Sequence, residues 1–178
     1  MRVPLPGDNA LGIILPDKIT RIIDPWRKQY DPFYEIFPPH ITLIYPPFIT
    51  PREWKKDKPE LQKLMQHFFS FDIYLKDLGN FNSDQNWVLW IKPEDNGCLH
   101  LLRKLIVKQF WEHISIMPFD YIPHVTIGRF DNYQDYLVAE KRVKDELSPM
   151  MFKVESMHYL IFDDKWTFNI EDKIDIGQ

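Results

Sequence analysis

Two short stretches, PPHITLIYPP (Pro38–Pro47) and PHVTIGRF (Pro123–Phe130), repeat one pattern of residues. Each places a histidine directly after a proline and a threonine two positions later. For a chain with 6 histidines, chance alone yields a His-x-Thr triplet about 0.17 times. Two are present, and proline precedes both. The repeat therefore indicates a duplicated site and not a coincidence.

Both stretches have the character of short strands. Residues i and i+2 of a strand point to the same face, so His40 and Thr42 would stand side by side, as would His124 and Thr126. The intervening Ile41 would point into the core, as would its counterpart in the second stretch. Two such strands facing each other across a cleft would bring together two imidazoles and two hydroxyl groups.

This set of groups suits an in-line displacement at phosphorus. A neutral histidine can accept a proton from the nucleophile, while a protonated one gives a proton to the leaving oxygen. An ordinary histidine pKa near 6.5 makes both forms available close to neutral pH. The threonine hydroxyls can donate hydrogen bonds to the phosphate oxygens. The scheme needs neither a metal nor a cofactor.

Outward from the two motifs, strand-like and helix-like periods alternate. Asp17 is the expected N-cap of the first helix, which Pro25 should kink or end. Asp57 and Glu60 have the spacing of a capping box for the second. The expected strands are 10–15, 41–45, 71–78, 87–91, 123–130, 152–162 and 166–176. The loop 79–86 joins the strands 71–78 and 87–91. The expected helices are 17–30, 57–68, 99–110 and 133–147.

The order of these elements predicts an α+β fold. We expect a bilobal chain with two pseudo-symmetric, interleaved lobes, each holding one His-x-Thr motif. Antiparallel sheets would surround a central cleft, with helices outside. No low-complexity linker interrupts the chain, so we expect one domain over residues 1–178.

The composition of the chain limits the kinds of molecule that we expect it to bind. The net charge of −4 argues against a protein that coats long duplex nucleic acid by neutralising phosphates, although a site for one phosphate group remains compatible with it. The single cysteine, Cys98, cannot form an internal disulfide, and no apolar stretch is long enough for a signal segment or a membrane span. We expect a cytoplasmic monomer without membrane partners.

The motifs and the segment RKQYDPFYEIFPPHITLIYPPF (Arg27–Phe48) resemble the two-histidine (2H) phosphoesterase superfamily, and in particular the LigT-like 2′-5′ RNA ligases and cyclic phosphodiesterases and their YjcG-like branch. The resemblance implies the bilobal LigT-like fold. It also implies that His40 is the proton donor and His124 the proton acceptor, while Thr42 and Thr126 hold the phosphate. An arginine often ends the family's second motif, and Arg129 stands at that place. Arg129 would either bind phosphate or cap its strand at the surface.

Other candidate residues carry weaker signals. Phe81, Phe119 and Tyr121 are the best candidates for stacking on a nucleobase, which requires an exposed ring. The remaining histidines share no spacing with a second ligand, so we interpret them as structural or solvated and expect no metal site. These histidines are His67, His100, His113 and His158.

The expected function is that of a metal-independent phosphoesterase. Its substrate would be a 2′,3′-cyclic phosphate or a 2′-5′ phosphodiester of a small nucleotide or an RNA terminus, with reversible 2′-5′ ligation as a variant at the same site. One alternative is a non-catalytic protein that binds RNA ends or nucleotides through the same motifs. A second alternative, a metal-dependent hydrolase, is disfavoured because no Asp/Glu ligand cluster accompanies the histidines.

Overall fold

The computed structural model describes residues 5–83, 86–114, 120–165 and 167–177 and contains two four-stranded sheets. The first sheet has the strand order β2 (His40–Ile44), β1 (Asn9–Ile14), β7 (Ser156–Phe162) and β8 (Phe168–Asp175). The second has the order β5 (Val125–Phe130), β4 (Asn86–Glu94), β3 (Phe71–Ser83) and β6 (Met150–Val154). All neighbouring strands are antiparallel. The expected α+β fold with two antiparallel sheets is confirmed.

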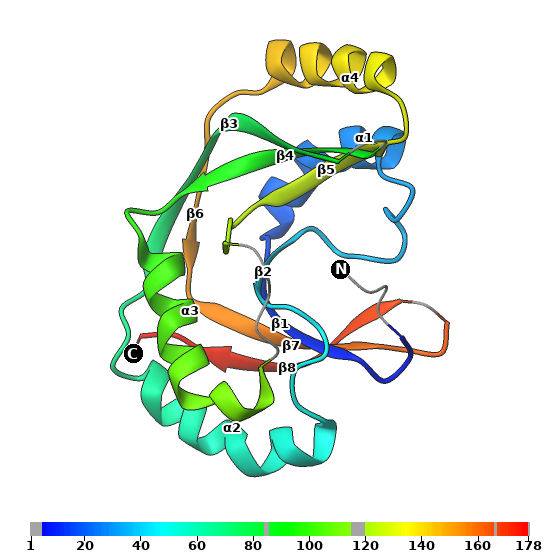
Figure 1. Cartoon of the computed structure of the whole chain (residues 1–178). Coiled ribbons are helices and arrows are strands. Elements are labelled where there is room, and N and C mark those ends of the chain that lie inside the picture. The colour runs from blue at the N-terminus through cyan, green and yellow to red at the C-terminus, as the bar shows by residue number, and fades with distance from the viewer. Residues whose placement is uncertain (1–4, 84–85, 115–119, 166, 178) are drawn as a thin grey trace.

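Helices α1 (Asp17–Tyr30) and α3 (Cys98–Gln109) each connect two strands of one sheet but pack against the other sheet. α1 joins two strands of the first sheet but packs against β5 of the second, and α3 follows β4 of the second sheet but packs against β2 of the first (Figure 1). α2 (Pro51–Met65) lies against β8, and α4 (Tyr133–Glu146) covers β3, β4 and β5. A short 3-10 helix, Trp111–His113, follows α3. The exchange of α1 and α3 joins the two sheets into one body.

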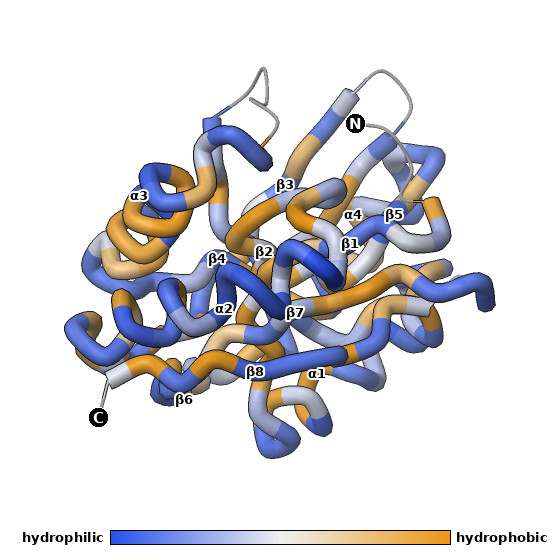
Figure 2. Tube along the Cα trace, turned by 90° about the horizontal axis from the view of Figure 1, so that it is seen from below, coloured by the Kyte–Doolittle hydropathy of each residue, from blue (hydrophilic) through white to orange (hydrophobic). Residues whose placement is uncertain are grey.

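The hydrophobic core runs through both sheets. One continuous cluster contains Leu11 and Tyr159 of the first sheet and Ile73 and Val125 of the second, together with the apolar faces of the helices. Figure 2 shows the contrast between β7, which is mostly hydrophobic, and the outer helix α2, which is largely hydrophilic. Within the described residues, no helix has the length and apolar character needed to cross a membrane.

The expected strand 152–162 is wrong, because the chain forms two strands there. β6 ends at Val154 in the second sheet, and β7 begins at Ser156 in the first. Phe152 and Val154 are buried at even positions, whereas Met157 and Tyr159 are buried at odd ones. The phase of the alternation changes at the crossing between sheets, which a continuous apolar stretch conceals.

Three further boundaries differ from expectation. β3 pairs with β4 as far as Ser83, so most of the expected loop 79–86 is strand. α2 begins at Pro51, with a capping box formed by Thr50 and Glu53, because its first two turns carry few apolar residues and give no helical period. α1 begins at Asp17 after an N-cap at Pro16 and continues through Pro25 to Tyr30. Burial of one face of α1 against the second sheet offsets the backbone hydrogen bond that a proline removes.

Candidate active site

Both motifs lie on edge strands, and these edges meet. β2 and β5 are the outermost strands of their sheets, and their Cα atoms approach within 8 Å. The hydroxyl of Tyr121, just before the second motif, donates a hydrogen bond of 2.9 Å to the backbone carbonyl of Thr42. The fold therefore brings together two motifs that lie more than 80 residues apart in the sequence.

The two histidines share one hydrogen-bonding arrangement. Nδ1 of His40 lies 2.7 Å from the carbonyl oxygen of Pro38, and Nδ1 of His124 lies 2.8 Å from that of Ile122. A carbonyl oxygen only accepts, so each Nδ1 carries a proton and donates it. In the neutral ring, Nε2 is then left with a lone pair. Both imidazoles are thus set in the tautomer whose Nε2 can act as a base.

Burial and nearby cations keep both imidazoles neutral. Burial is the main cause that lowers the pKa of His40 to about 4, and the positive charges of His124, Arg27 and Arg129 lower it further, against the effect of the Pro38 carbonyl. Burial also lowers the pKa of His124, with a smaller contribution from Arg129. A charge on His124 therefore makes protonation of His40 less favourable.

Each threonine follows its histidine by two residues at the start of an edge strand, with His40 the first residue of β2 and His124 directly before β5. Ile41, Leu43, Val125 and Ile127 are completely buried in the core. Thr42 and Thr126 alternate with these residues and therefore lie on the opposite faces of β2 and β5, where both are partly exposed. Thr42 pairs with Gly12 of β1, a position without a side chain that would cover it.

An irregularity in β5 places Arg129 on the same face as Thr126. Thr126 pairs with Trp90 and Arg129 with Val88, two positions apart on β4, although the two β5 residues are three positions apart. In a regular strand, residues i and i+3 point to opposite faces. The extra residue of this β-bulge shifts the alternation by one position, so that the Arg129 side chain points to the same face as Thr126. β-Bulges often redirect a side chain in this way near a functional site.

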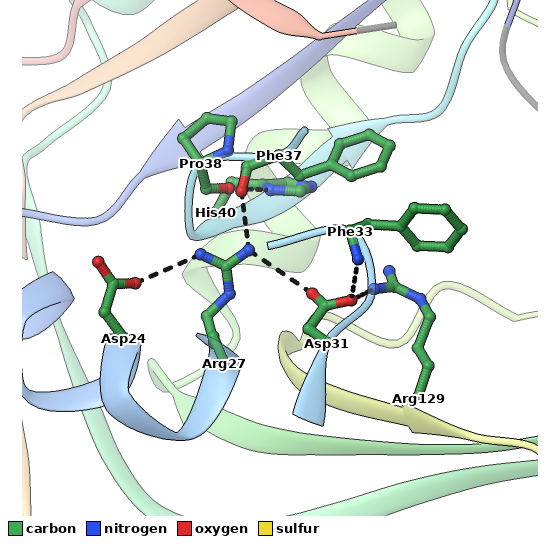
Figure 3. Close-up of polar contacts among 8 residues, drawn as sticks. All are labelled: Asp24, Arg27, Asp31, Phe33, Phe37, Pro38, His40 and Arg129. Carbon is green, nitrogen blue, oxygen red and sulfur yellow. Dashed lines mark hydrogen bonds and ion pairs between the residues drawn. The ribbon is translucent and has the colours of Figure 1, made fainter. Parts of the chain in front are cut away.

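Arg129 is held by an acidic residue outside the motifs. The Arg129 guanidinium pairs with the buried carboxylate of Asp31 and packs over the ring of Phe33 (Figure 3). The same carboxylate also lies 3.6 Å from the guanidinium of Arg27. Arg27 donates a hydrogen bond of 2.7 Å to the carbonyl of Phe37, close to His40. Arg27 and Arg129 therefore share the buried carboxylate of Asp31, and Asp24 also lies 3.4 Å from Arg27.

Sequence reasoning did not identify Arg27, Asp31 or Phe33 as part of this network. The i,i+4 spacing of Arg27 and Asp31 at the end of a helix indicates an ion pair, but it does not show that Arg129 shares the same carboxylate. Phe33, Asp31 and Arg129 also line a cavity of about 710 Å³ between the ends of α1 and β5, and neither motif histidine is part of its lining.

The stacking candidates have different surroundings. Phe81 meets the His124 ring edge-on at a centroid distance of 4.9 Å and lies 5.0 Å from Trp90. The guanidinium of Arg103 lies over the Tyr121 ring, 4.7 Å from the ring centre, and the same ring contacts His100. Phe119 lies outside the described residues. Base stacking by Phe81 and Tyr121 remains a prediction.

The other histidines lie apart from the motif pair. His67 and His100 are exposed, His113 is 3.8 Å from the carboxylate of Glu53, and His158 lies on β7. In the described parts of the chain, no three His, Cys, Asp or Glu side chains are grouped in a way that could hold a metal ion.

The fold and the sequence together assign the chain to a family. The family model of the 2′-5′ RNA ligase superfamily matches residues 15–166, and the chain belongs to this superfamily of LigT-like phosphoesterases. Two relatives named "Putative phosphoesterase" are similar along almost their whole length. The one from Geobacillus thermodenitrificans is 28% identical over 169 residues (93% of this chain and 95% of the relative), and the one from Geobacillus kaustophilus is 27% identical over 160 residues (88% and 91%).

Solved structures share the fold at low sequence identity. Escherichia coli LigT complexed with 3′-AMP aligns with a TM-score of 0.69 and 17% identity, covering 98% of this chain and all of LigT. TT0787 of Thermus thermophilus aligns with a TM-score of 0.63 and 18% identity, covering 94% and 97%. LigT has also been crystallised with ATP and with NADP+. The family model thus confirms the expected superfamily, and these alignments confirm the expected LigT-like fold.

Proposed function

We propose that this protein is a metal-independent phosphoesterase that hydrolyses a 2′,3′-cyclic phosphate or a 2′-5′ phosphodiester at a nucleotide or RNA terminus. One observation carries the proposal: two histidines on adjoining strand edges hold the same tautomer through carbonyls two residues earlier. The nucleotide complexes of the structural relative LigT agree with a nucleotide ligand.

In the proposed reaction, the phosphate lies between the two imidazoles. Nε2 of His124 accepts a proton from water as its oxygen attacks phosphorus, and protonated His40 gives a proton to the departing ribose oxygen. Thr42, Thr126 and Arg129 stabilise the negative charge on the non-bridging oxygens. Bringing the anionic phosphate between the rings raises both histidine pKa values, so that a proton can reside on His40. The assignment of donor and acceptor follows the family.

Replacing either histidine tests the mechanism. We expect His40→Ala and His124→Ala each to lower turnover of a 2′,3′-cyclic nucleotide by a factor of about 10² to 10⁴, the range for loss of a general acid or base. His67→Ala, at an exposed histidine outside the site, is the matched control and should retain full turnover. Circular dichroism would show that the variants fold. Undiminished turnover in a folded His40 or His124 variant contradicts the mechanism.

The substrate is tested with a panel of 2′,3′-cyclic, 1″,2″-cyclic and 2′-5′-linked compounds. Phosphorus NMR would show which compounds change and which oxygen keeps the phosphate. We expect turnover of at least one cyclic or 2′-5′-linked compound, undiminished by EDTA. Tight binding of these compounds without any product would favour the alternative of a non-catalytic protein that binds nucleotides or RNA ends.

A further inference from the structure

Arg103 on α3 is a partly buried cation that forms no ion pair within the described residues. Arg27, Arg103 and Arg129 are the arginines in the described residues that are not exposed. Arg27 and Arg129 pair with Asp31, whereas Arg103 has no ion pair there, and its Nε is shielded from solvent without a hydrogen-bond partner. A guanidinium N–H that is shielded from water without an acceptor costs free energy unless a ligand oxygen completes the site.

The surroundings hold this guanidinium beside the first motif. Arg103 lies 4.7 Å from the centre of the Tyr121 ring, and the hydroxyl of Tyr121 donates to the carbonyl of Thr42. α3 itself packs against β2 (Figure 1). A single tyrosine side chain thus connects Arg103 to the backbone of the first motif.

The neighbouring tyrosines remain hydrogen-bond donors. Burial raises the pKa of Tyr45 and of Tyr121, and the charge of Arg103 only partly opposes this effect at both residues. Neither phenol therefore becomes a counter-anion for Arg103 near neutral pH. The planar guanidinium is the side chain best matched to the oxygens of a phosphate group, which it can bind through two parallel hydrogen bonds.

We propose that Arg103 forms a second phosphate subsite and that the ligand of this protein carries two phosphate groups, one between the histidines and one at Arg103. The proposal rests on the proposed function for the position of the first phosphate. It narrows the ligand class to a nucleoside bisphosphate or to the last two nucleotides of an RNA end.

Calorimetric titration with product-like probes tests the subsite without requiring turnover. The probes are uridine 3′-monophosphate and uridine 3′,5′-bisphosphate. We expect the wild type to bind the bisphosphate about tenfold more tightly, the effect of one charge-assisted hydrogen-bonding group. Arg103→Gln should remove this preference and leave the affinity for the monophosphate unchanged. Lys104→Gln, which removes the exposed charge next along α3, should retain the preference.

A third probe, the dinucleotide UpUp with a 3′-phosphate, distinguishes the two sources of the second phosphate. Tighter binding of UpUp than of the bisphosphate indicates the diester of an RNA chain, and the reverse order indicates a free phosphate. Arg103→Lys keeps the charge but loses the planar fork, so it should show an intermediate preference if Arg103→Gln fails to fold.

The subsite is overturned if the wild type shows no preference for a second phosphate, or if the preference survives in Arg103→Gln or is undiminished in Arg103→Lys. Equal weakening of all probes in Arg103→Gln also overturns it. Since no probe needs to react, failure of the hydrolysis assay leaves this result interpretable and concerns the proposed function alone.

Discussion

At the scale of single residues, the lowered pKa values of the two histidines decide the pH at which the pair can work. Acid–base catalysis by the pair needs one neutral and one protonated ring. With the pKa of His40 at about 4 and that of His124 lowered from 6.5, the singly protonated pair is most populated in an acidic window, where its proton resides mainly on His124. The catalytic form with the proton on His40 is a minor part of the same population and follows the same pH dependence. Above this window the pair has lost its proton, and below it both rings are charged.

We therefore expect kcat/KM, which reports the free enzyme, to have its optimum below pH 6.5. Arg129→Gln removes a positive charge that lowers both histidine pKa values, so both limbs of the profile should move to higher pH. Lys28→Gln, an exposed change on α1, should leave the profile in place. A wild-type optimum above pH 7 would show that these two lowered pKa values do not govern the reaction.

Asp31 is a second residue whose effect can be measured directly. Its side chain is only 1% exposed and faces the guanidinium groups of Arg27 and Arg129. Asp31→Asn leaves these cations without their shared carboxylate, so the free energy of unfolding should fall by about 3 kcal/mol, as it does when one partner of a buried ion pair is removed.

Urea denaturation measures this loss, with Asp24→Asn as the control. Asp24 also pairs with Arg27, at 3.4 Å, but its side chain is 27% exposed, so the control should lose less than about 1 kcal/mol. Equal losses in the two variants would mean that Asp31 has no special part in holding Arg129.

At the scale of elements, the packing of α1 on β5 depends on a glycine in the bulge. A Cβ atom at Gly128 would lie 2.7 Å from Cβ of Tyr30 and 2.8 Å from the Phe130 ring. The Tyr30 Cβ is fixed to the helix backbone and cannot move aside alone. We expect Gly128→Ala to lower the free energy of unfolding by about 1–3 kcal/mol, as overpacking does. A fully stable variant in urea denaturation would show that α1 shifts freely on the sheet.

The elements also show what sequence patterns can and cannot reveal. The motif strands follow from alternation, because Ile41 and Val125 are buried while the threonines beside them are not. The bulge that redirects Arg129 left no sequence signal other than Gly128. The crossing at Glu155 was missed because apolar residues continue on both sides of it, and only a change in phase marks it.

Some residues of the candidate site could be predicted from the sequence, and others could not. Paired His-x-Thr spacing singled out two histidines whose strands, β2 and β5, lie edge to edge, and their catalytic roles remain a prediction. Asp31 and Arg103 could not be recognised, because each acquires its meaning from a partner on a distant element, Arg129 in one case and Tyr121 in the other. Contacts of this kind depend on the tertiary arrangement and not on local periodicity.

At the scale of the whole molecule, charge limits how much nucleic acid the protein can contact. The chain carries a net charge of −4, and the cations around the motifs are few. We expect affinity for single-stranded RNA with a 3′-phosphate to fall with salt at a logarithmic slope of about 0.7–1.4, corresponding to one or two phosphates. A 4-mer and a 20-mer with the same end should bind equally well. Affinity that rises with length would indicate a continuous RNA-binding surface instead.

The exchanged helices α1 and α3 restrict how the molecule can move. Enzymes that close around a ligand by domain rotation need a few residues that act as a hinge and an interface that can open. Here, opening the sheets apart would strip α1 from β5 and α3 from β2, which exposes core residues of both. The spacing between the two histidines is therefore built into the fold, and a ligand must fit that spacing on arrival, with loop and side-chain adjustments as the remaining freedom.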